Sequence, residues 1–254
     1  EDFFALGGHS LMLVRLATAI RRELGAELSI AQLFTAPTVA AMARLVDGER
    51  PAADALAPVL RLQTGGTRPP LFVLPPASGL TWQFAALKRH LPAEVPLIGL
   101  QSPRLSRSTD LPQTLAALAA EHAGHVAALA PDGPVRLLGW SFGGFLAHEL
   151  AVQLVRAGRE VSFVGMLDAH RDGGPDAGDL RLLLAELGYP PPPGTDPTLA
   201  DAVAIMRAHG DGVAAALTDE QAQAVVANYL ESDLMTDDRR PGVLAADVFF
   251  VDAT

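Results

Sequence analysis

The sequence predicts an α/β protein preceded by a small all-α segment, and three observations support this class. From Pro70 onward, short apolar runs alternate with helix-like segments, the pattern of a parallel sheet covered by helices. Residues 1–47 contain only short helix-like segments. Residues 48–58 (GERPAADALAP) are rich in Ala and Pro without periodicity, which is typical of a linker.

Two segments of the N-terminal part have the spacing of amphipathic helices. The first covers residues 10–24 and ends before Gly25, and the second covers residues 38–46 and follows Pro37. Glycine after a helix and proline before one are common boundary residues. Residues 1–47 are therefore predicted to form a small helical unit.

Five mainly apolar runs are predicted as strands, and runs that are apolar on both sides are typical of central strands covered on both faces. Between the last two runs, an insertion at about 171–241 contains three helix-like segments, the third opened by a Thr-x-x-Gln capping box. An insertion this long and helical predicts a lid over the sheet. The strands are predicted at 71–74, 96–100, 135–138, 161–167 and 247–251, and the insertion helices at 179–187, 198–208 and 218–231.

Composition excludes several classes of protein. Hydrophobic residues make up 49% of the chain and mean hydropathy is +0.24, which excludes general disorder. The absence of cysteine excludes disulfides, thiolate metal sites and a thiol nucleophile, and it fits a reducing compartment. A net charge of −10 has the wrong sign for nucleic-acid binding. With no apolar run of about 18 residues, we expect a soluble cytoplasmic protein without membrane, nucleic-acid or metal partners.

The strongest chemical signal is Gly-Trp-Ser-Phe-Gly at residues 139–143. It follows an apolar run and precedes an amphipathic stretch, the strand–turn–helix context that a G-x-S-x-G nucleophile requires. Glycines on both sides permit a strained reversal that exposes the Ser141 hydroxyl, and the following helix N-terminus favours negative charge on the attacked carbonyl. An ordinary glycine-rich turn is the alternative. We interpret Ser141 as the nucleophile.

A nucleophilic serine needs a base and a carboxylate that orients the base. Asp168 directly follows the run at 161–167, at the carboxyl end of a predicted strand, where α/β sheets place functional side chains. A turn residue or helix cap is the alternative. No histidine of the sequence follows the last apolar run, where the hydrolase order Ser, Asp, His would place the base.

Two backbone amides are candidates for an oxyanion hole. The turn at 75–79 (PPASG) follows an early predicted strand, and its prolines constrain the backbone so that the Ala77 amide can face the nucleophile. Phe142, directly after Ser141, supplies the second amide. A plain turn is the alternative at 75–79. The aromatic residues Trp82, Phe84, Trp140 and Phe142 are candidates either for a substrate pocket or for core packing.

These motifs together resemble a known family. Residues 70–254 are similar to the type I thioesterases of nonribosomal peptide synthetases, which are α/β hydrolases: the segments PPLFVLPPASG, IGLQSPR, LLGWSFGG and FVGMLDAH match in order. Residues 1–47 resemble the latter part of a peptidyl carrier domain. The segments that carry this resemblance are DFFALGGHSL and LFTAPTVAAMARLV. LTWQFAALKRHL and IGLQSPR are most similar to siderophore synthetases.

The resemblance implies a domain organisation. Residues 1–47 would be a partial carrier, a four-helix bundle whose first helix precedes Glu1. Residues 48–58 would be a linker, and residues 59–254 an α/β-hydrolase thioesterase with its lid at about 171–241. The family's catalytic histidine would lie beyond Thr254, so the sequence is expected to be incomplete at both ends.

The resemblance also implies a cofactor, an activity and partners. Ser10 would carry covalent 4'-phosphopantetheine; two glycines and a histidine precede it and a predicted helix follows, which suits an anionic phosphodiester, although a simple helix cap is the alternative. A peptidyl or acyl thioester would pass from this arm to Ser141 and leave by hydrolysis or macrocyclisation. The implied partners are upstream condensation and adenylation domains and a phosphopantetheinyl transferase.

Two other functions remain open at this point: an inactive hydrolase fold that only docks a carrier, and a carrier-fused editing thioesterase. The sequence does not indicate the acyl chain, the choice between hydrolysis, cyclisation and oligomerisation, or the oligomeric state. The acidic insertion, with five Arg against thirteen Asp and Glu in residues 171–241, fits a cationic acyl chain but equally a solvated helix surface.

Overall fold

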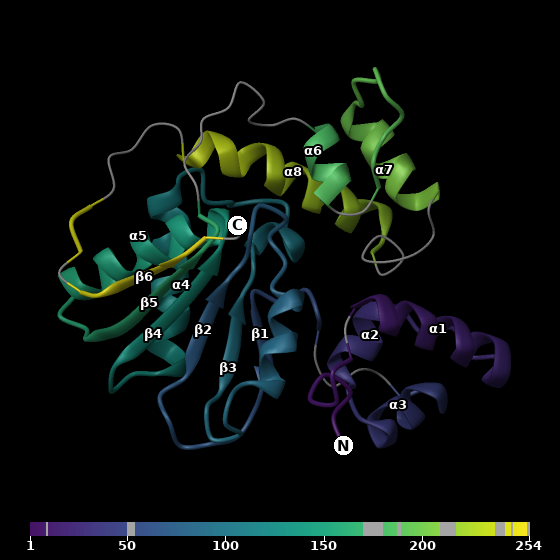
Figure 1. The fold of residues 1–254 in the computed structure, drawn as a ribbon, viewed down its shortest axis with the longest axis horizontal. Helices are drawn as coiled ribbons and strands as arrows, with labels where there is room; N and C mark the ends of the chain where they lie inside the picture. Colours follow the sequence, from purple (N-terminus) through teal and green to yellow (C-terminus); the bar gives the residue numbers. More distant parts are fainter. Residues whose placement is uncertain are drawn as a thin grey trace.

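The computed structural model describes residues 1–8, 10–49, 54–169, 180–186, 189–208, 217–236, 242–244 and 246–252. These residues form three parts: a small helical N-terminal unit, a sheet flanked by helices, and a group of helices above one edge of the sheet (Figure 1). No helix within these ranges is both long and apolar enough to cross a membrane.

The N-terminal unit contains both predicted helices and one more. α1 (Ser10–Leu24) and α3 (Val39–Val46) agree with the prediction. The sequence analysis did not predict α2 (Ile30–Thr35), a helix of only six residues. Its start is fixed by a capping box in which the Ser29 side chain accepts from the Gln32 N–H and the Gln32 side chain accepts from the Ser29 N–H.

The sheet contains all five predicted strands and one that was missed, in the order β1-β3-β2-β4-β5-β6. β1 pairs antiparallel with β3, whereas the other pairs are parallel, so the sheet is mixed and the prediction of a purely parallel sheet was wrong at this edge. β1 alternates buried and exposed residues, and a half-exposed strand does not form a continuous apolar run. The strands are β1 (Val59–Gln63), β2 (Leu71–Leu74), β3 (Leu97–Leu100), β4 (Val135–Trp140), β5 (Val161–Leu167) and β6 (Val248–Val251).

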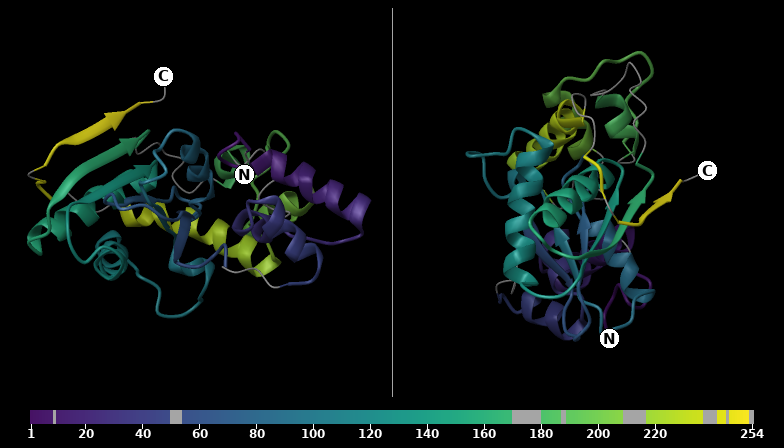
Figure 2. Two further views of the ribbon diagram at one scale, coloured as in Figure 1. Left: turned by 90° about the horizontal axis from the view of Figure 1, so that it is seen from below. Right: turned by 90° about the vertical axis from the view of Figure 1, so that its left-hand side faces the viewer.

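Successive residues of the strands contribute to two cores on opposite faces of the sheet. Phe72 and Leu74 of β2 pack in a cluster with α4 (Leu115–Leu129) and α5 (Phe142–Arg156). Leu71 and Val73 belong to a second cluster that includes the 3₁₀ helix η1 (Trp82–Arg89) and the N-terminal unit. Figure 2 shows the helices on both sides of the twisted sheet. The expectation of double-sided burial is confirmed for β2, all of whose residues are buried.

The same expectation was wrong for β6. Val248, Phe249, Phe250 and Val251 are all exposed, with between 40% and 54% of each residue accessible. β6 pairs with β5, and the Phe249 ring stacks on Phe163 with ring centroids 5.3 Å apart. An apolar run predicts a strand, but its neighbours determine its burial.

The predicted insertion helices are present as α6 (Leu180–Glu186), α7 (Leu199–Ala208) and α8 (Asp219–Thr236). The capping box at the start of α8 is confirmed: Gln221 N–H donates to Thr218 Oγ1 at 3.3 Å, and Thr218 N–H donates to Gln221 Oε1 at 2.8 Å. α8 continues five residues beyond its predicted end. It lies across the sheet edge and contacts α5 and the 3₁₀ turn η2 (Pro103–Leu105) (Figure 1).

The N-terminal unit packs against η1. The Phe34 ring of α2 stacks on Trp82 with centroids 5.3 Å apart and planes at 22°. Lys88 forms an ion pair with Asp2 and lies over the Phe4 ring, 5.6 Å from its centroid. These contacts join the helical unit and the sheet through one apolar cluster.

The end of the predicted linker is part of this packing. Ala55 and Leu56 are each only 3% exposed. The Ala55 carbonyl accepts from Trp82 Nε1 at 2.9 Å and from Gln101 Nε2 at 2.8 Å. Residues 54–57 are therefore fixed to the sheet side rather than free, although their Ala- and Pro-rich composition is that of a linker.

His122 gives the fold a pH-dependent stability. It is fully buried in α4, neither ring nitrogen has a hydrogen-bond partner among the described residues, and burial lowers its pKa to about 3, assisted by His125 and opposed by Glu121. Unfolding restores a pKa near 6.5. Above that pH the ring is neutral in both states, so burying it costs the folded state no stability through deprotonation. Stability is lost as the pH falls from 6.5 towards 3.

We expect the free energy of unfolding to fall by about 2–3 kcal/mol between pH 7 and pH 4.5 on account of His122 alone. Urea unfolding of the wild type and of His122→Met at both pH values measures this fall. In the variant the free energy of unfolding should fall by about 2–3 kcal/mol less than in the wild type. His90→Gln, which changes an exposed histidine, is the control and should retain the wild-type pH dependence. Equal pH dependence in wild type and His122→Met would contradict the assignment.

Candidate active site

Ser141 occupies a strained turn between β4 and α5. Its φ is 53° and its ψ is −124°, a backbone conformation that residues other than glycine rarely adopt. The Ser141 N–H donates to the Leu167 carbonyl of β5 at 2.8 Å, and the Gly144 N–H donates to the Ser141 carbonyl at 2.8 Å. These bonds hold the serine at the carboxyl edge of the sheet, in the arrangement that G-x-S-x-G motifs form.

The two glycines of the motif allow this close approach of strand and helix. A Cβ on Gly139 would lie 1.9 Å from the Gly143 carbonyl oxygen. A Cβ on Gly143 would lie 2.4 Å from the Leu74 carbonyl oxygen and 2.5 Å from that of Pro75. Because these obstacles are backbone atoms, the turn requires glycine at both positions for steric reasons.

Gly143→Ala is therefore expected to destabilise the protein by about 1–3 kcal/mol, the usual cost of overpacking, and to displace the Ser141 turn. The matched control is Gly124→Ala in α4, where an added Cβ has no neighbour within 4 Å. Alanine there should stabilise the helix by about 0.5–1 kcal/mol. Urea unfolding measures the stability of both variants. Equal stability of Gly143→Ala and Gly124→Ala would contradict the close packing of the turn.

Asp168 lies beside Ser141 because of the strand register. Trp140 of β4 pairs with Leu167 of β5, so Ser141 and Asp168 are the next residues after two paired positions. Asp168 also has a positive φ of 48°, and its N–H donates to the Val251 carbonyl of β6 at 2.7 Å. Parallel strands thus place the two residues predicted as nucleophile and orienting carboxylate next to each other at the carboxyl edge of the sheet.

The two candidate oxyanion donors lie on one pocket. Ala77 belongs to the turn after β2, and Phe142 is the first residue of α5, where the N–H has no partner within the helix. Both line a cavity bounded also by Leu118 of α4 and Met235 of α8. Of the other aromatic candidates, Trp82 and Phe84 are buried in the core, and Trp140 is 41% exposed.

The described histidines lie away from this edge of the sheet. His122 and His125 are in α4, His148 is in α5 two turns beyond Ser141, and His90 follows η1. His9, His170 and His209 are outside the described residues. Within the described ranges there is also no cluster of three or more His, Asp or Glu that could hold a metal ion.

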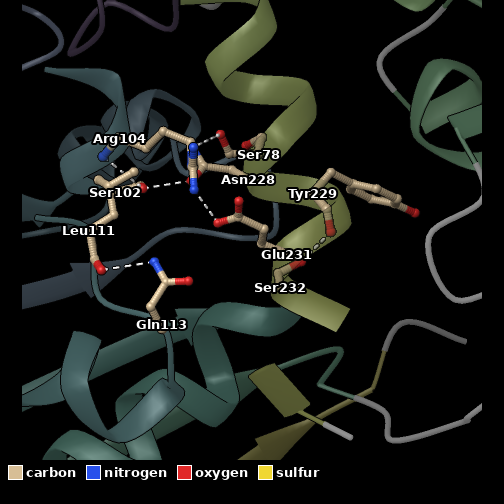
Figure 3. A network of polar contacts seen from close by, with 9 residues as sticks. All are labelled: Ser78, Ser102, Arg104, Leu111, Gln113, Asn228, Tyr229, Glu231 and Ser232. Carbon is tan, nitrogen blue, oxygen red and sulfur yellow. Dashed lines mark hydrogen bonds and ion pairs between the residues drawn. The ribbon is translucent and has the colours of Figure 1, made fainter. Parts of the chain in front are cut away.

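A polar network that the sequence analysis did not predict joins α8 to the pocket (Figure 3). Asn228 contacts Ser78 and Ser102, and Glu231 forms an ion pair with Arg104. These partners are between 126 and 150 residues apart in the chain. No local sequence pattern indicates these contacts, because the two partners of each contact lie in segments far apart in the chain.

Ser10 lies at a second, separate site. It is the first residue of α1, a helix of 15 residues with no acidic residue in its first turn. The preceding turn is tight: Gly7 has a φ of +95°, and a Cβ on Gly8 would lie 2.3 Å from the Phe3 ring. The positive end of an uncompensated helix dipole fits the phosphodiester of 4'-phosphopantetheine.

A serine turn at the carboxyl edge of a mainly parallel sheet, covered by helices on both faces, defines an α/β hydrolase. The family described as thioesterase domain matches residues 69–241, and the family described as phosphopantetheine attachment site matches residues 1–46. The chain belongs to the thioesterase family and has an N-terminal phosphopantetheine attachment domain, which carries this cofactor covalently.

The relatives are multidomain synthetases. The chain is 38% identical over 264 residues to a dimodular nonribosomal peptide synthase of Bacillus subtilis (strain 168), covering 100% of this chain and 11% of that protein. It is 38% identical over 169 residues to enterobactin synthase component F of Escherichia coli (strain K12), covering 66% of this chain and 13% of that protein. The second relative confirms the predicted similarity to siderophore synthetases. The chain spans about a tenth of the length of either relative.

Solved structures agree with the sequence relatives. A four-domain nonribosomal peptide synthetase bound to AMP and glycine matches 100% of this chain and 20% of its own, with a TM-score of 0.67 and 25% identity. The NocB thioesterase domain, in covalent complex with a fluorophosphonate nocardicin G analogue, covers 76% of this chain and 77% of its own, with a TM-score of 0.58 and 29% identity. The predicted carrier–thioesterase didomain is confirmed.

Proposed function

We propose that the chain is the terminating carrier–thioesterase unit of a nonribosomal peptide synthetase. It takes a peptidyl or acyl thioester from its own carrier onto Ser141 and releases the product by hydrolysis or macrocyclisation. The observation that carries this proposal is the strained Ser141 turn, beside a pocket lined by Ala77 and Phe142. In organisation, we assign residues 1–47 to the carrier, 48–58 to the linker, 59–254 to the thioesterase and about 171–241 to its lid.

Ser10 is the proposed attachment residue. The 4'-phosphopantetheine group supplies a flexible arm that carries the chain as a thioester. The N-terminus of α1 stabilises the charge of the phosphodiester, and the Gly7–Gly8 turn keeps the backbone before Ser10 close to Phe3. A phosphopantetheinyl transferase must install the arm, and upstream condensation and adenylation domains must load it.

Ser141 then attacks the thioester carbonyl. Its Oγ forms a bond to the carbonyl carbon as a histidine base takes the hydroxyl proton, and the carbonyl electron pair moves onto oxygen. The N–H groups of Ala77 and Phe142 hold this oxyanion. Collapse of the adduct breaks the C–S bond, the departing sulfur takes the proton from the histidine, and the acyl chain remains on Ser141. Water or a nucleophile within the chain repeats the sequence and frees Ser141.

Asp168 orients the histidine and stabilises its charged form. The Trp140–Leu167 pair, after which Ser141 and Asp168 are the next residues on adjacent strands, supports the two roles.

Intact-protein mass spectrometry of the full-length protein tests the proposal. A phosphopantetheinyl transferase and an acyl-coenzyme A load the carrier, and the acyl mass should then disappear as free acid or macrocycle forms. An acyl mass that persists in the wild type at the rate of spontaneous thioester hydrolysis would contradict it and favour an inactive carrier-docking hydrolase. Selective release of short, misprimed acyl groups would instead favour an editing enzyme.

A further inference from the structure

The turn at residues 75–79 carries the Ala77 N–H that we propose as an oxyanion donor, and both ends of this turn are packed. At its start, Gly143 of α5 approaches the carbonyls of Leu74 and Pro75 so closely that no Cβ would fit. At its end, the Ser102 N–H donates to the Gly79 carbonyl at 3.0 Å. A donor to developing charge must be held to within about 0.5 Å, so what fixes the middle of the turn matters for catalysis.

One side chain from the insertion reaches the middle of the turn. Asn228 Nδ2 of α8 donates to the Ser78 carbonyl at 3.4 Å, and Asn228 Oδ1 accepts from Ser102 Oγ at 2.7 Å (Figure 3). Since a carbonyl can only accept, the amide nitrogen must face Ser78. A Cβ on Gly79 would lie 2.4 Å from Asn228 Nδ2, so the turn and α8 are in direct contact.

Glu231 holds the same helix without contacting the turn. It lies one helical turn beyond Asn228 and forms an ion pair with Arg104 of η2. The two side chains therefore have separable effects: Glu231 attaches α8 to η2, whereas Asn228 contacts the backbone next to Ala77.

We propose that Asn228 is a positioning residue for the oxyanion hole. By holding the Ser78 carbonyl from α8, it keeps the Ala77 N–H directed at the pocket, and the hole is complete only while α8 is seated on the turn. This inference rests on the proposed thioesterase function and adds to it a link between the insertion and the rate of acyl transfer.

The test uses Asn228→Asp in the full-length protein with a small acyl thioester, acyl-N-acetylcysteamine. Aspartate keeps the shape and the acceptor for Ser102 but places a carboxylate oxygen opposite the Ser78 carbonyl. We expect kcat to fall about 10- to 100-fold while KM stays within about threefold, because only the tetrahedral state uses the donor. The affinity of an acyl boronic-acid analogue, which forms a tetrahedral adduct with Ser141, should fall by the same factor.

The matched control is Gln221→Ala, which removes the capping box at the start of the same helix, away from the residues that line the pocket, and should lower kcat by less than about threefold. Equal losses in both variants, accompanied by equal falls in Tm, would indicate a merely structural role and overturn the proposal. It would also be overturned if Asn228→Asp kept kcat and analogue affinity within about twofold of the wild type. A wild type that turns over no thioester would contradict the proposed function instead, and the analogue affinities would still decide the role of Asn228.

Discussion

Ser141→Ala is expected to lower the rate of chain release by about 10⁶-fold in the full-length protein, with the acyl chain left on the carrier. The variant keeps the Ala77 and Phe142 amides, the pocket and the packing of the N-terminal unit, but it has no atom that can attack the thioester. Alanine also removes no described side-chain bond, since the Ser141 hydroxyl does not cap α5. The measurement is the acyl mass on the protein against time.

Ser106→Ala is the matched control, because Ser106 is an exposed serine whose hydroxyl bonds only to the nearby Pro103 carbonyl. It should release product at the wild-type rate. Release by Ser141→Ala at an unmodified rate would show that the G-W-S-F-G segment is a turn and not a nucleophile site.

The rate of chain release in Asp168→Asn should lie between the rates in Ser141→Ala and in Ser106→Ala. The nucleophile remains, but its base loses orientation and the stabilisation of its charged form, a loss on the order of 10⁴ in rate in serine proteases. Acyl transfer should therefore still occur on long incubation in Asp168→Asn, whereas it should be undetectable in Ser141→Ala. The reverse ranking would exclude the assigned roles.

Ser10→Ala is expected to prevent attachment of the phosphopantetheine arm completely, because no other hydroxyl occupies the start of α1. Incubation with a phosphopantetheinyl transferase and coenzyme A, followed by intact-protein mass spectrometry, measures the gain of one arm. The N-terminal unit provides a matched control in Ser29, which also begins a helix but whose side chain accepts from the Gln32 N–H.

Ser29→Ala should weaken α2 by about 0.5–2 kcal/mol as a lost N-cap, yet it should still gain the arm. A mass increase that persists in Ser10→Ala would contradict the carrier assignment of Ser10. Loss of the increase in Ser29→Ala alone would place the attachment at Ser29.

The features that could be predicted from the sequence are those that depend mainly on neighbouring residues in the chain. Gly139, Ser141 and Gly143 form a motif of five residues that is recognised from the sequence alone, and the flanking strand and helix were predicted from their own apolar patterns. The obstacle at Gly139 lies within the motif, whereas the carbonyls that exclude a Cβ at Gly143 belong to Leu74 and Pro75. Asp168 was located by a rule of almost equal simplicity, since functional side chains follow the carboxyl ends of parallel strands. The Trp140–Leu167 register then set the two residues side by side.

Tertiary structure decided the features that depend on partners distant in the chain. The sequence analysis expected β6 to be buried and did not predict β1, because an apolar run predicts a strand but not its neighbours. Residues such as Ala55, in a segment with the composition of a linker, became fixed only through the side chains of Trp82 and Gln101.

The sequence alone thus determined most of the elements, their order and the two candidate serines, since propensity and periodicity act over a few residues. The contact of Asn228 with Ser78, 150 residues away, was decided only by how α8 lies across the sheet edge. This hydrogen bond leaves no mark on the segment that accepts it, because any residue at position 78 offers the same backbone carbonyl. The candidate catalytic residues were recognised from local patterns, whereas the contacts that hold them in position are tertiary.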